Sequence, residues 1–401
     1  MKQCIYLVLL LFSFSNFIES AQDGEPPAKV ARVDDPRGLE LVAAVRENDF
    51  ATMEKLLKDG VSIFTKTPER GSCLLNPAIG NGHKEIFYYL VRNGLADHLN
   101  YQNSEGVTPF MLAAQEGYPD LVKFMLKKGG VDGLVTTASN NGSTALLLAV
   151  LNRKINVVQL LIKHQACVNT GGGELKTTPL MVASNNADEA MVKLLLNHQA
   201  EVDKQRDLGD TALIFAVEKG NFPIVKLLLE HGADPLLANN YGLTGFMIAC
   251  REGYFKIAQL LFDHNPGIVN LETTNKETAL FYAAYRGHTA IVEWLLKNGS
   301  DIHKGLKNNN LHTPLYAAAF MGHLPVIKVI ENFLNQSNTS IIYLWNFEAV
   351  VNNAYHKGEN NIVVYLANRV KKAGLRIPVY LQCVIDAENM IFSVSSEIQH
   401  I

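Results

Sequence analysis

The stretch Thr211–Asp234, TALIFAVEKGNFPIVKLLLEHGAD, predicts two short helices that decide the fold. The Thr211 hydroxyl is placed to accept a hydrogen bond from a free N–H at the start of the first helix. Leu213 and Ala216 are three residues apart, so they share one face of that helix. Gly220 can adopt the left-handed conformation that ends a helix, and a second helix with an apolar stripe follows. Neither helix can bury its stripe alone, so the sequence must supply neighbours.

The same unit occurs ten times, with spacings of 33 to 36 residues between successive copies. Its first position is Leu39, Cys73, Thr108, Thr144, Thr178, Thr211, Thr244, Thr278, Thr313 and Ala349. Five residues later every copy has an alanine, and a small residue there lets adjacent helices approach to about 8–10 Å. Seventeen residues after each start lies an apolar ladder of Leu56, Leu90, Met125, Leu161, Leu195, Leu228, Leu261, Leu295, Ile330 and Leu366. The chain is therefore expected to be a repeat array rather than one compact core.

Several copies carry short motifs of a known repeat: Thr178-Pro179-Leu180, Thr313-Pro314-Leu315, Gly287-His288 and His231-Gly232-Ala233-Asp234. On these residues the unit resembles the ankyrin repeat, and the resemblance covers about residues 38–368. It implies an all-α solenoid of stacked helix pairs with protruding β-hairpin-type loops, and a concave face that binds other proteins. The histidine of the family's Thr-Pro-Leu-His motif is replaced here by apolar residues. We therefore expect less of the family's usual hydrogen bonding from loop to loop.

The N-terminal residues 1–20 have the pattern of a secretory signal peptide. Met1-Lys2 gives a positive start, Ile5–Phe14 is apolar apart from Ser13, and Ser20 offers a small residue for cleavage. The apolar run has about ten residues, too few to span a bilayer, so no stable membrane span is expected after cleavage. A buried helix or an uncleaved anchor are the alternatives.

The regions flanking the repeats predict a linker and two caps. Residues 21–37 contain proline and charge without apolar periodicity and are expected to be a disordered linker. The first and last copies are more polar than the others, as the terminal repeats of a stack need to be for solubility. Residues 369–401 are expected to form a C-terminal cap or tail with a basic patch of Arg369, Lys371, Lys372 and Arg376.

Histidine and cysteine do not form a metal or redox site in this pattern. His164, His198, His231 and His264 each end a second helix, one per repeat. Repeats about 8–10 Å apart cannot share one zinc ion with bonds of about 2 Å, so structural roles are expected, with a pH-sensing ladder as the alternative. Cys73, Cys167 and Cys250 lie about three repeats apart, too far for disulfides, and no Cys-x-x-Cys occurs. We expect neither metal nor cofactor.

The sequence also lacks signatures of an enzyme or a nucleic-acid-binding protein. No phosphate-binding loop, Gly-x-Ser-x-Gly elbow or His-Glu-x-x-His motif occurs, and the repeats occupy nearly all of the length. The formal net charge of −3 gives no support to a nucleic-acid surface. We therefore expect a monomeric, non-enzymatic scaffold that binds a protein partner.

Residues that differ between copies are the candidates for specificity. The resemblance implies that the two residues before the interhelix glycine point into the concave groove. In the later copies these positions are rich in Arg, aromatic residues and Met, the types that dominate interfaces. The predicted partner site is Tyr241, Arg251, Tyr285, Arg286, Phe320, Met321 and Lys357, whose basic groups favour an acidic partner. The alternative is that these residues pack on one another.

Two functional classes remain open. The first is a secreted scaffold, such as an effector or a toxin-like component. In that case Asn141, Asn298, Asn335 and Asn338, which fit the N-glycosylation pattern, are candidate acceptors. The second is an intracellular adaptor whose apolar N-terminus is a membrane anchor or reflects a misassigned start.

Overall fold

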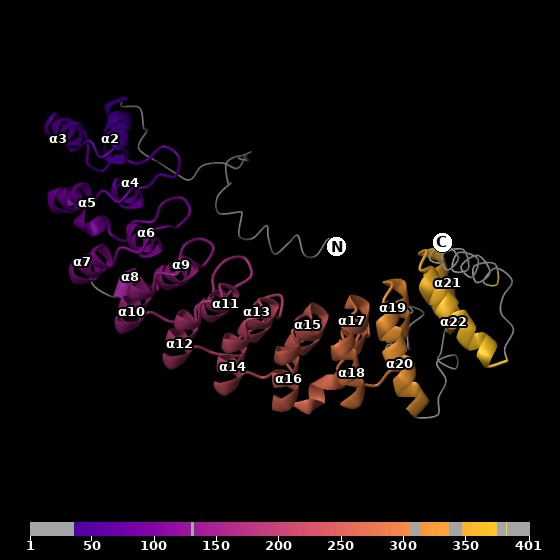
Figure 1. The fold of residues 1–401 in the computed structure, drawn as a ribbon. Coiled ribbons are helices and arrows are strands. Elements are labelled where there is room, and N and C mark those ends of the chain that lie inside the picture. Colours follow the sequence, from indigo (N-terminus) through magenta and orange to yellow (C-terminus); the bar gives the residue numbers. More distant parts are fainter. Residues whose placement is uncertain (1–35, 130–131, 305–312, 337–346, 375–381, 383–401) are drawn as a thin grey trace, which may run out of the picture.

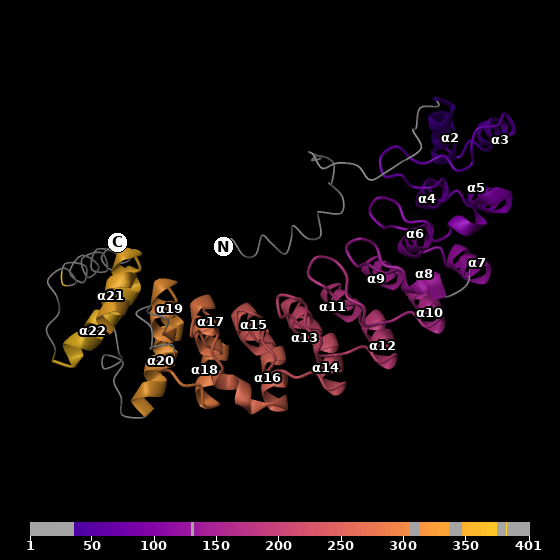
Figure 2. The same cartoon turned by 180° about the vertical axis from the view of Figure 1, so that it is seen from behind.

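In the computed structural model, which describes residues 36–129, 132–304, 313–336, 347–374 and 382, the chain forms an arc of stacked helix pairs (Figure 1). The first helix of each pair lies on the inner, concave side of the arc, and the second helix lies on the outer side, as the reverse view in Figure 2 also shows. Loops before the first helices, here called fingers, project toward the inner side. The all-α prediction is confirmed.

The helix pairs follow the ten predicted copies. The first helices are α2 (Pro36–Arg46), α4 (Leu75–Gly80), α6 (Pro109–Glu116), α9 (Ala145–Leu151), α11 (Pro179–Asn185), α13 (Ala212–Glu218), α15 (Gly245–Glu252), α17 (Ala279–Arg286), α19 (Pro314–Phe320) and α21 (Phe347–His356). The second helices are α3 (Phe50–Lys58), α5 (Lys84–Leu90), α7 (Pro119–Gly129), α10 (Ile155–Lys163), α12 (Glu189–Asn197), α14 (Phe222–Glu230), α16 (Phe255–His264), α18 (Thr289–Lys297), α20 (Leu324–Gln336) and α22 (Asn360–Lys372). Short helical turns η1 (Val91–Leu95), η2 (Ala96–His98), α8 (Asp132–Thr136) and η3 (Pro266–Asn270) lie in connections between repeats.

Threonine begins the first helix in seven copies because its hydroxyl satisfies an otherwise free backbone N–H. Thr211 Oγ1 accepts from Ile214 N at 3.3 Å, and Thr108 Oγ1 accepts from Met111 N at 3.1 Å. The same bond occurs at Thr144, Thr178, Thr244, Thr278 and Thr313. The capping role expected from the sequence is confirmed.

The repeated alanine and the apolar ladder form one continuous core. Ala113, Ala216 and Ala283 are fully buried, and Leu161 and Leu228 of the ladder are fully buried as well. Adjacent first helices pack directly on one another along the stack, for example α15 on α17 and α17 on α19. Each repeat therefore covers the apolar face of its neighbour, which is how a one-dimensional stack gains stability.

The interhelix glycine is needed for two reasons at Gly253. Its φ of +81° lies in the left-handed region, and a Cβ there would be 2.7 Å from Cε1 of His288 in the next repeat. His288 Nε2 is also 2.9 Å from the carbonyl oxygen of Arg251. The ring of His288 thus packs over one repeat while its backbone belongs to the next, so it ties the two together.

Two other histidines that follow an interhelix glycine make the same contact to the preceding repeat. His83 Nε2 is 2.9 Å from the carbonyl oxygen of Arg46, and His323 Nε2 is 3.1 Å from that of Tyr285. In the part of the chain that the structure describes, no three His, Cys, Asp or Glu side chains are grouped to hold a metal ion. Cys73, Cys167 and Cys250 are free thiols, as their spacing predicts, and Cys383 lies outside the described residues.

The loops are hydrogen-bonded to one another although the family's histidine is replaced. Neighbouring fingers are joined through their backbones, which do not depend on the replaced histidine. Asn140 N donates to Glu105 O at 3.0 Å, and Asn240 N donates to Leu208 O at 3.0 Å. Asn140 Nδ2 adds a bond of 2.8 Å to Ser104 O. Isolated antiparallel bridges, such as Ala138 with Thr144, give the fingers their hairpin character.

Among the described residues, α2 is the first helix and starts at Pro36, and Arg369 lies within α22 (Asn360–Lys372) rather than in a separate tail. The predicted signal peptide, most of the linker, and the tail beyond Gly374 apart from residue 382 lie outside the described residues. Within the described ranges, no helix is both long and apolar enough to cross a membrane.

Candidate functional site

The predicted partner residues on the helices lie at equivalent places, where each first helix ends on the concave side. Arg251 is in α15, Tyr285 and Arg286 end α17, Phe320 ends α19, and Lys357 follows α21. Because α15, α17, α19 and α21 follow one another in the stack, these ends form a row. Together with Met321 they are called the C-terminal concave patch below.

Aromatic rings of the patch are held by stacking within their own helices. Tyr285 is stacked on Phe281, with ring centroids 6.1 Å apart and an interplanar angle of 23°. Phe320 is stacked on Tyr316, also at 6.1 Å and with an angle of 19°. Each pair is four residues apart, the spacing at which helix side chains meet. Packing among these residues therefore occurs, yet Tyr285 and Phe320 remain only half-buried.

The charged residues of the patch differ in whether a carboxylate of the chain pairs with them. Arg251 Nε donates to Glu252 Oε1 at 2.7 Å, and its side chain is 27% exposed. Lys357 Nζ lies 4.4 Å from the centroid of the Phe320 ring, a cation–π contact. Arg286 is exposed, and among the described residues neither Arg286 nor Lys357 forms an ion pair with a carboxylate. Two cations are thus available on this face.

Met321 and Tyr241 present exposed apolar surface, but from different elements. Met321 follows α19 and is 38% exposed beside Phe320. Tyr241 is 52% exposed in the finger before α15. Its backbone carbonyl accepts from Thr274 N and Thr274 Oγ1, both at 3.1 Å, so its hydrogen bonds join two fingers and do not reach the patch. Tyr241 therefore belongs to the finger row, not to the row of helix ends.

Three buried polar atoms without a hydrogen-bond partner lie in two neighbouring first helices nearer the middle of the stack. Glu218 ends α13 and Asn185 ends α11, at the same position in consecutive repeats. Glu218 Oε2, Asn185 Oδ1 and the hydroxyl oxygen of Ser184 are buried without a hydrogen-bond partner in the described structure. The sequence signal for Glu218 and Asn185 was that their position differs between copies, and no signal pointed to Ser184.

The surroundings of Glu218 shift the pKa of its carboxyl. Burial raises the pKa of the Glu218 carboxyl, and the nearby charge of Asp210 raises it further, while Arg251 opposes the shift. Asp210 is itself in a buried ion pair with Arg206, and its Oδ1 accepts from Asn239 Nδ2 at 2.9 Å. The Arg206 guanidinium also lies 4.9 Å from the centroid of the Phe215 ring.

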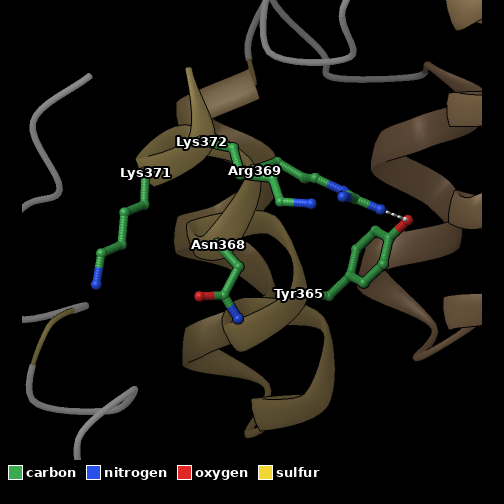
Figure 3. Close-up of a pocket in the computed structure, with 5 residues that line it drawn as sticks. All are labelled: Tyr365, Asn368, Arg369, Lys371 and Lys372. Carbon is green, nitrogen blue, oxygen red and sulfur yellow. Dashed lines mark hydrogen bonds between the residues drawn. The ribbon is translucent and has the colours of Figure 1, made fainter. Parts of the chain in front are cut away.

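The predicted basic patch near the C-terminus does not converge into a binding site. A hollow of about 590 Å³ beside α22 is lined by Tyr365, Asn368, Arg369, Lys371 and Lys372 (Figure 3). Arg369 Nη2 donates to Tyr365 Oη at 3.1 Å, and Arg369 Nε is 2.7 Å from Glu331 Oε1, so this cation is neutralised. Figure 3 shows Lys371 pointing away from Tyr365 and Arg369.

Predicted glycosylation positions differ in their surroundings. Asn141 is exposed in a finger, although its Oδ1 accepts from Ser139 Oγ and Ser143 N. Asn298 Nδ2, the atom that would carry a glycan, donates to Trp294 O at 2.7 Å. Asn335 is exposed near the end of α20, and Asn338 lies outside the described residues.

Comparisons with known proteins agree with the helix pairs. A family model described as ankyrin repeats (3 copies) matches residues 41–136, 130–206, 180–269 and 246–335. The chain is 29% identical over 187 residues to Rabankyrin-5 of Mus musculus, an alignment that covers 46% of this chain and 14% of the relative. It is 24% identical over 217 residues to the transient receptor potential cation channel subfamily A member 1 of Homo sapiens, covering 44% and 19%.

A smaller relative also matches part of the chain. A putative ankyrin repeat protein of Fowlpox virus is 29% identical over 137 residues, which is 34% of this chain and 39% of the relative. The chain thus spans less than a fifth of the two larger relatives. The matched models comprise ankyrin repeats alone, which are typically non-catalytic modules that bind proteins.

Proposed function

The chain belongs to the ankyrin-repeat family, and we propose that it is a non-enzymatic scaffold whose C-terminal concave patch binds an acidic segment of a protein partner. The patch offers aromatic, Met and Arg side chains, which are enriched at interfaces and dominate their energetics. A segment with carboxylates would pair with the cations and lay its apolar groups against Phe320 and Met321.

The observation that carries the proposal is the placement of Arg286 and Lys357. These exposed cations lie in the repeats on either side of the one that contributes Phe320, and no carboxylate of the described chain pairs with them. A protein with a formal net charge of −3 thus keeps unneutralised positive charge at this point. Complementary charges of this kind favour specificity and fast association.

The proposal is tested on an array of immobilised twelve-residue peptides in which each position is Glu, Leu or Ser. We expect the wild-type protein to be retained by Glu-containing peptides, with retention that weakens as salt is raised. Arg286→Glu combined with Lys357→Glu should reduce retention at least about tenfold, a loss of about 1.4 kcal/mol in binding free energy.

The matched control is Lys256→Glu, which reverses an exposed lysine on the outer helix α16. It should leave retention unchanged. Equal retention of the double variant and the wild-type protein would refute the assignment of the patch.

We also propose that the protein is secreted, on the basis of the apolar run Ile5–Phe14 and the residues around it. Sequencing the N-terminus of native protein should find a start near Ala21, and glycosidase treatment should reduce the mass if Asn141 or Asn335 carries a glycan. An intact Met1 and an unchanged mass would contradict secretion.

A second candidate is an intracellular adaptor with an anchored or misassigned N-terminus. The free thiols of Cys73, Cys167 and Cys250 favour it, because secreted proteins commonly pair their cysteines. The same N-terminal sequencing decides between the two.

A further inference from the structure

We infer that the outer side of the second, third and fourth repeats docks on a membrane surface that carries anionic lipids. The contact residues are Arg92, Lys127 and Lys163, called the outer basic row, with Lys123 and Lys128 beside them. This function goes beyond the proposed one and does not depend on it, because the partner site lies on the concave face and the row lies on the opposite side.

The row occupies one position of the repeat, two residues after the buried ladder residue of the second helix. Arg92 follows α5 in η1, Lys127 is in the last turn of α7, and Lys163 ends α10. All three side chains are exposed, and these helices lie on the outer side of the arc in Figures 1 and 2. Because repeats are about 8–10 Å apart, the row spans about 16–20 Å.

A position at the end of a helix does not by itself explain these cations. The helix dipole favours a cation near a helix C-terminus. Yet the same position is occupied by Asn197, Glu230 and Asp263 in the next three repeats. The repeat unit therefore does not require a basic residue there.

The outer helices of four other repeats each pair a lysine with a glutamate one turn away. These pairs are Lys58 with Glu54, Lys193 with Glu189, Lys226 with Glu230, and Lys297 with Glu293. Among the described residues, Arg92, Lys127 and Lys163 have no such ion pair. Helix α10 contains no acidic residue, and Asp120, the acid of α7, lies in its first turn and pairs with Lys84 at 3.5 Å.

The third repeat contributes most of the charge. Lys123 lies one turn before Lys127, and Lys128 follows it, so α7 presents three exposed lysines. Asp97 in η2 is an exposed carboxylate of the preceding repeat, and it forms no ion pair with these lysines in the described structure. Positive charge therefore stays unneutralised across this part of the outer side.

The shape of the molecule favours a flat partner for this charge. A flat surface can touch the outside of an arc over only a few consecutive repeats, and the row is confined to such a run. Each lysine or arginine close to anionic lipids is attracted to them, and the attraction falls off within a Debye length. Tyr88, half-buried one turn before Arg92, adds a side chain of the type that favours the boundary between lipid and water.

Docked in this way, the protein turns its concave face away from the membrane. The C-terminal concave patch then stays open, so a partner bound there would be held at the membrane surface.

The test is sedimentation of the full chain with vesicles of phosphatidylcholine and phosphatidylserine in a ratio of about three to one. We expect the wild-type protein to bind these vesicles, to bind phosphatidylcholine alone far less, and to be released as salt is raised. Lys127→Ala combined with Lys163→Ala should lower the partition coefficient at least about tenfold.

The matched control is Lys193→Ala combined with Lys226→Ala, which removes the same charge from the outer helices α12 and α14. Both lysines are already paired with glutamates, so this protein should bind the vesicles nearly as well as the wild-type protein. Gln159→Lys adds a cation one turn before Lys163 and should raise the binding that depends on phosphatidylserine several-fold, a gain that a misfolded protein cannot show.

Equal binding of the wild-type protein to both kinds of vesicle, or equal binding of the wild-type protein and the Lys127→Ala, Lys163→Ala variant, would overturn the inference. Retention on soluble polyglutamate that requires the row, without binding to vesicles, would also overturn it and assign the row to an acidic protein. Arg286→Glu with Lys357→Glu should still bind the vesicles, so failure of the proposed function would leave this inference standing.

Discussion

The ammonium of Lys357 lies 4.4 Å from the centroid of the Phe320 ring, so a cation of the last repeat covers an aromatic ring of the repeat before it. Lys357 is exposed and Phe320 is half-buried, and Arg286 is exposed one repeat earlier. Such a cation–π contact contributes only about 0.5–1 kcal/mol at an exposed site. This contact orients the Lys357 side chain and leaves its positive charge available to pair with a carboxylate. Such an arrangement is expected of a residue that contacts a partner rather than of a core residue.

Replacement of Lys357 by alanine should therefore separate stability from binding. We expect the free energy of unfolding in urea to fall by at most about 1 kcal/mol, because only an exposed contact is lost. Affinity for a glutamate-containing peptide, measured by fluorescence anisotropy, should fall several-fold. A large loss of stability with unchanged affinity would show that the contact is structural.

The packing of His288 over Gly253 predicts a strong effect of a single methyl group. Gly253→Ala places a Cβ 2.7 Å from the ring at a φ of +81°, so it should destabilise the protein by about 2 kcal/mol or more. Gly299→Ala is the matched control, because its φ is +85° but nothing lies within 4 Å of the added Cβ. It should cost about 1 kcal/mol, from the backbone conformation alone. Equal losses in thermal unfolding would rule out the contact with His288.

Glu218 predicts a defined dependence of stability on pH. Burial and Asp210 raise the pKa of its carboxyl above the ordinary value of 4.5, so the charged form destabilises the folded state at neutral pH. This penalty disappears as the pH falls through the raised pKa toward 4.5. Without a partner, Glu218→Gln should melt at a higher temperature than the wild-type protein at pH 7.

The difference in melting temperature between these two proteins should then shrink as the pH is lowered toward 4.5. Other carboxylates titrate in both proteins, so the difference isolates Glu218. A difference that is constant with pH would mean that the Glu218 carboxyl is not desolvated.

Glu331, Tyr365 and Arg369 join the last two repeats, since Glu331 is on α20 and the other two are on α22. Glu331 is 6% exposed, so removal of its cation leaves a buried carboxylate with Tyr365 as its remaining partner. Arg369→Ala should destabilise the last repeat by about 2 kcal/mol, whereas Lys371→Ala, which removes an exposed lysine of the same helix, should change little.

Hydrogen exchange is the measurement for this prediction, because a stack can open one repeat at a time. Amides of α22 should lose protection in Arg369→Ala while those of α13 keep it. Equal loss of amide protection in α13 and α22 would contradict a contact that stabilises only the last repeat.

Repetition made most of the fold predictable from the sequence. A threonine that caps a helix, an alanine that allows close approach and a leucine that fills the core each keep one role in every copy, as Thr211, Ala216 and Leu228 illustrate. Hydrogen bonding between the fingers could not be predicted from the replaced histidine, because it is made by backbone groups such as Asn240 N, whose pairing depends on conformation.

The candidate site was predictable from the sequence only in part, because contacts between individual side chains are not part of the repeat pattern. Variation between copies pointed to Arg286, Phe320 and Lys357, but it could not show which of them would be engaged by a neighbour. Whether a polar atom such as Glu218 Oε2 finds a donor depends on side chains from three repeats. That information is not contained in the repeat pattern.

Methyl NMR of methionine tests the central claim most directly, because Met321 lies in the C-terminal concave patch and Met53 and Met125 are fully buried elsewhere in the stack. On titration with a glutamate-containing peptide, we expect the ε-methyl signal of Met321 to shift while those of Met53 and Met125 stay in place. Binding of the peptide with an unmoved Met321 signal would show that the partner is held on another surface.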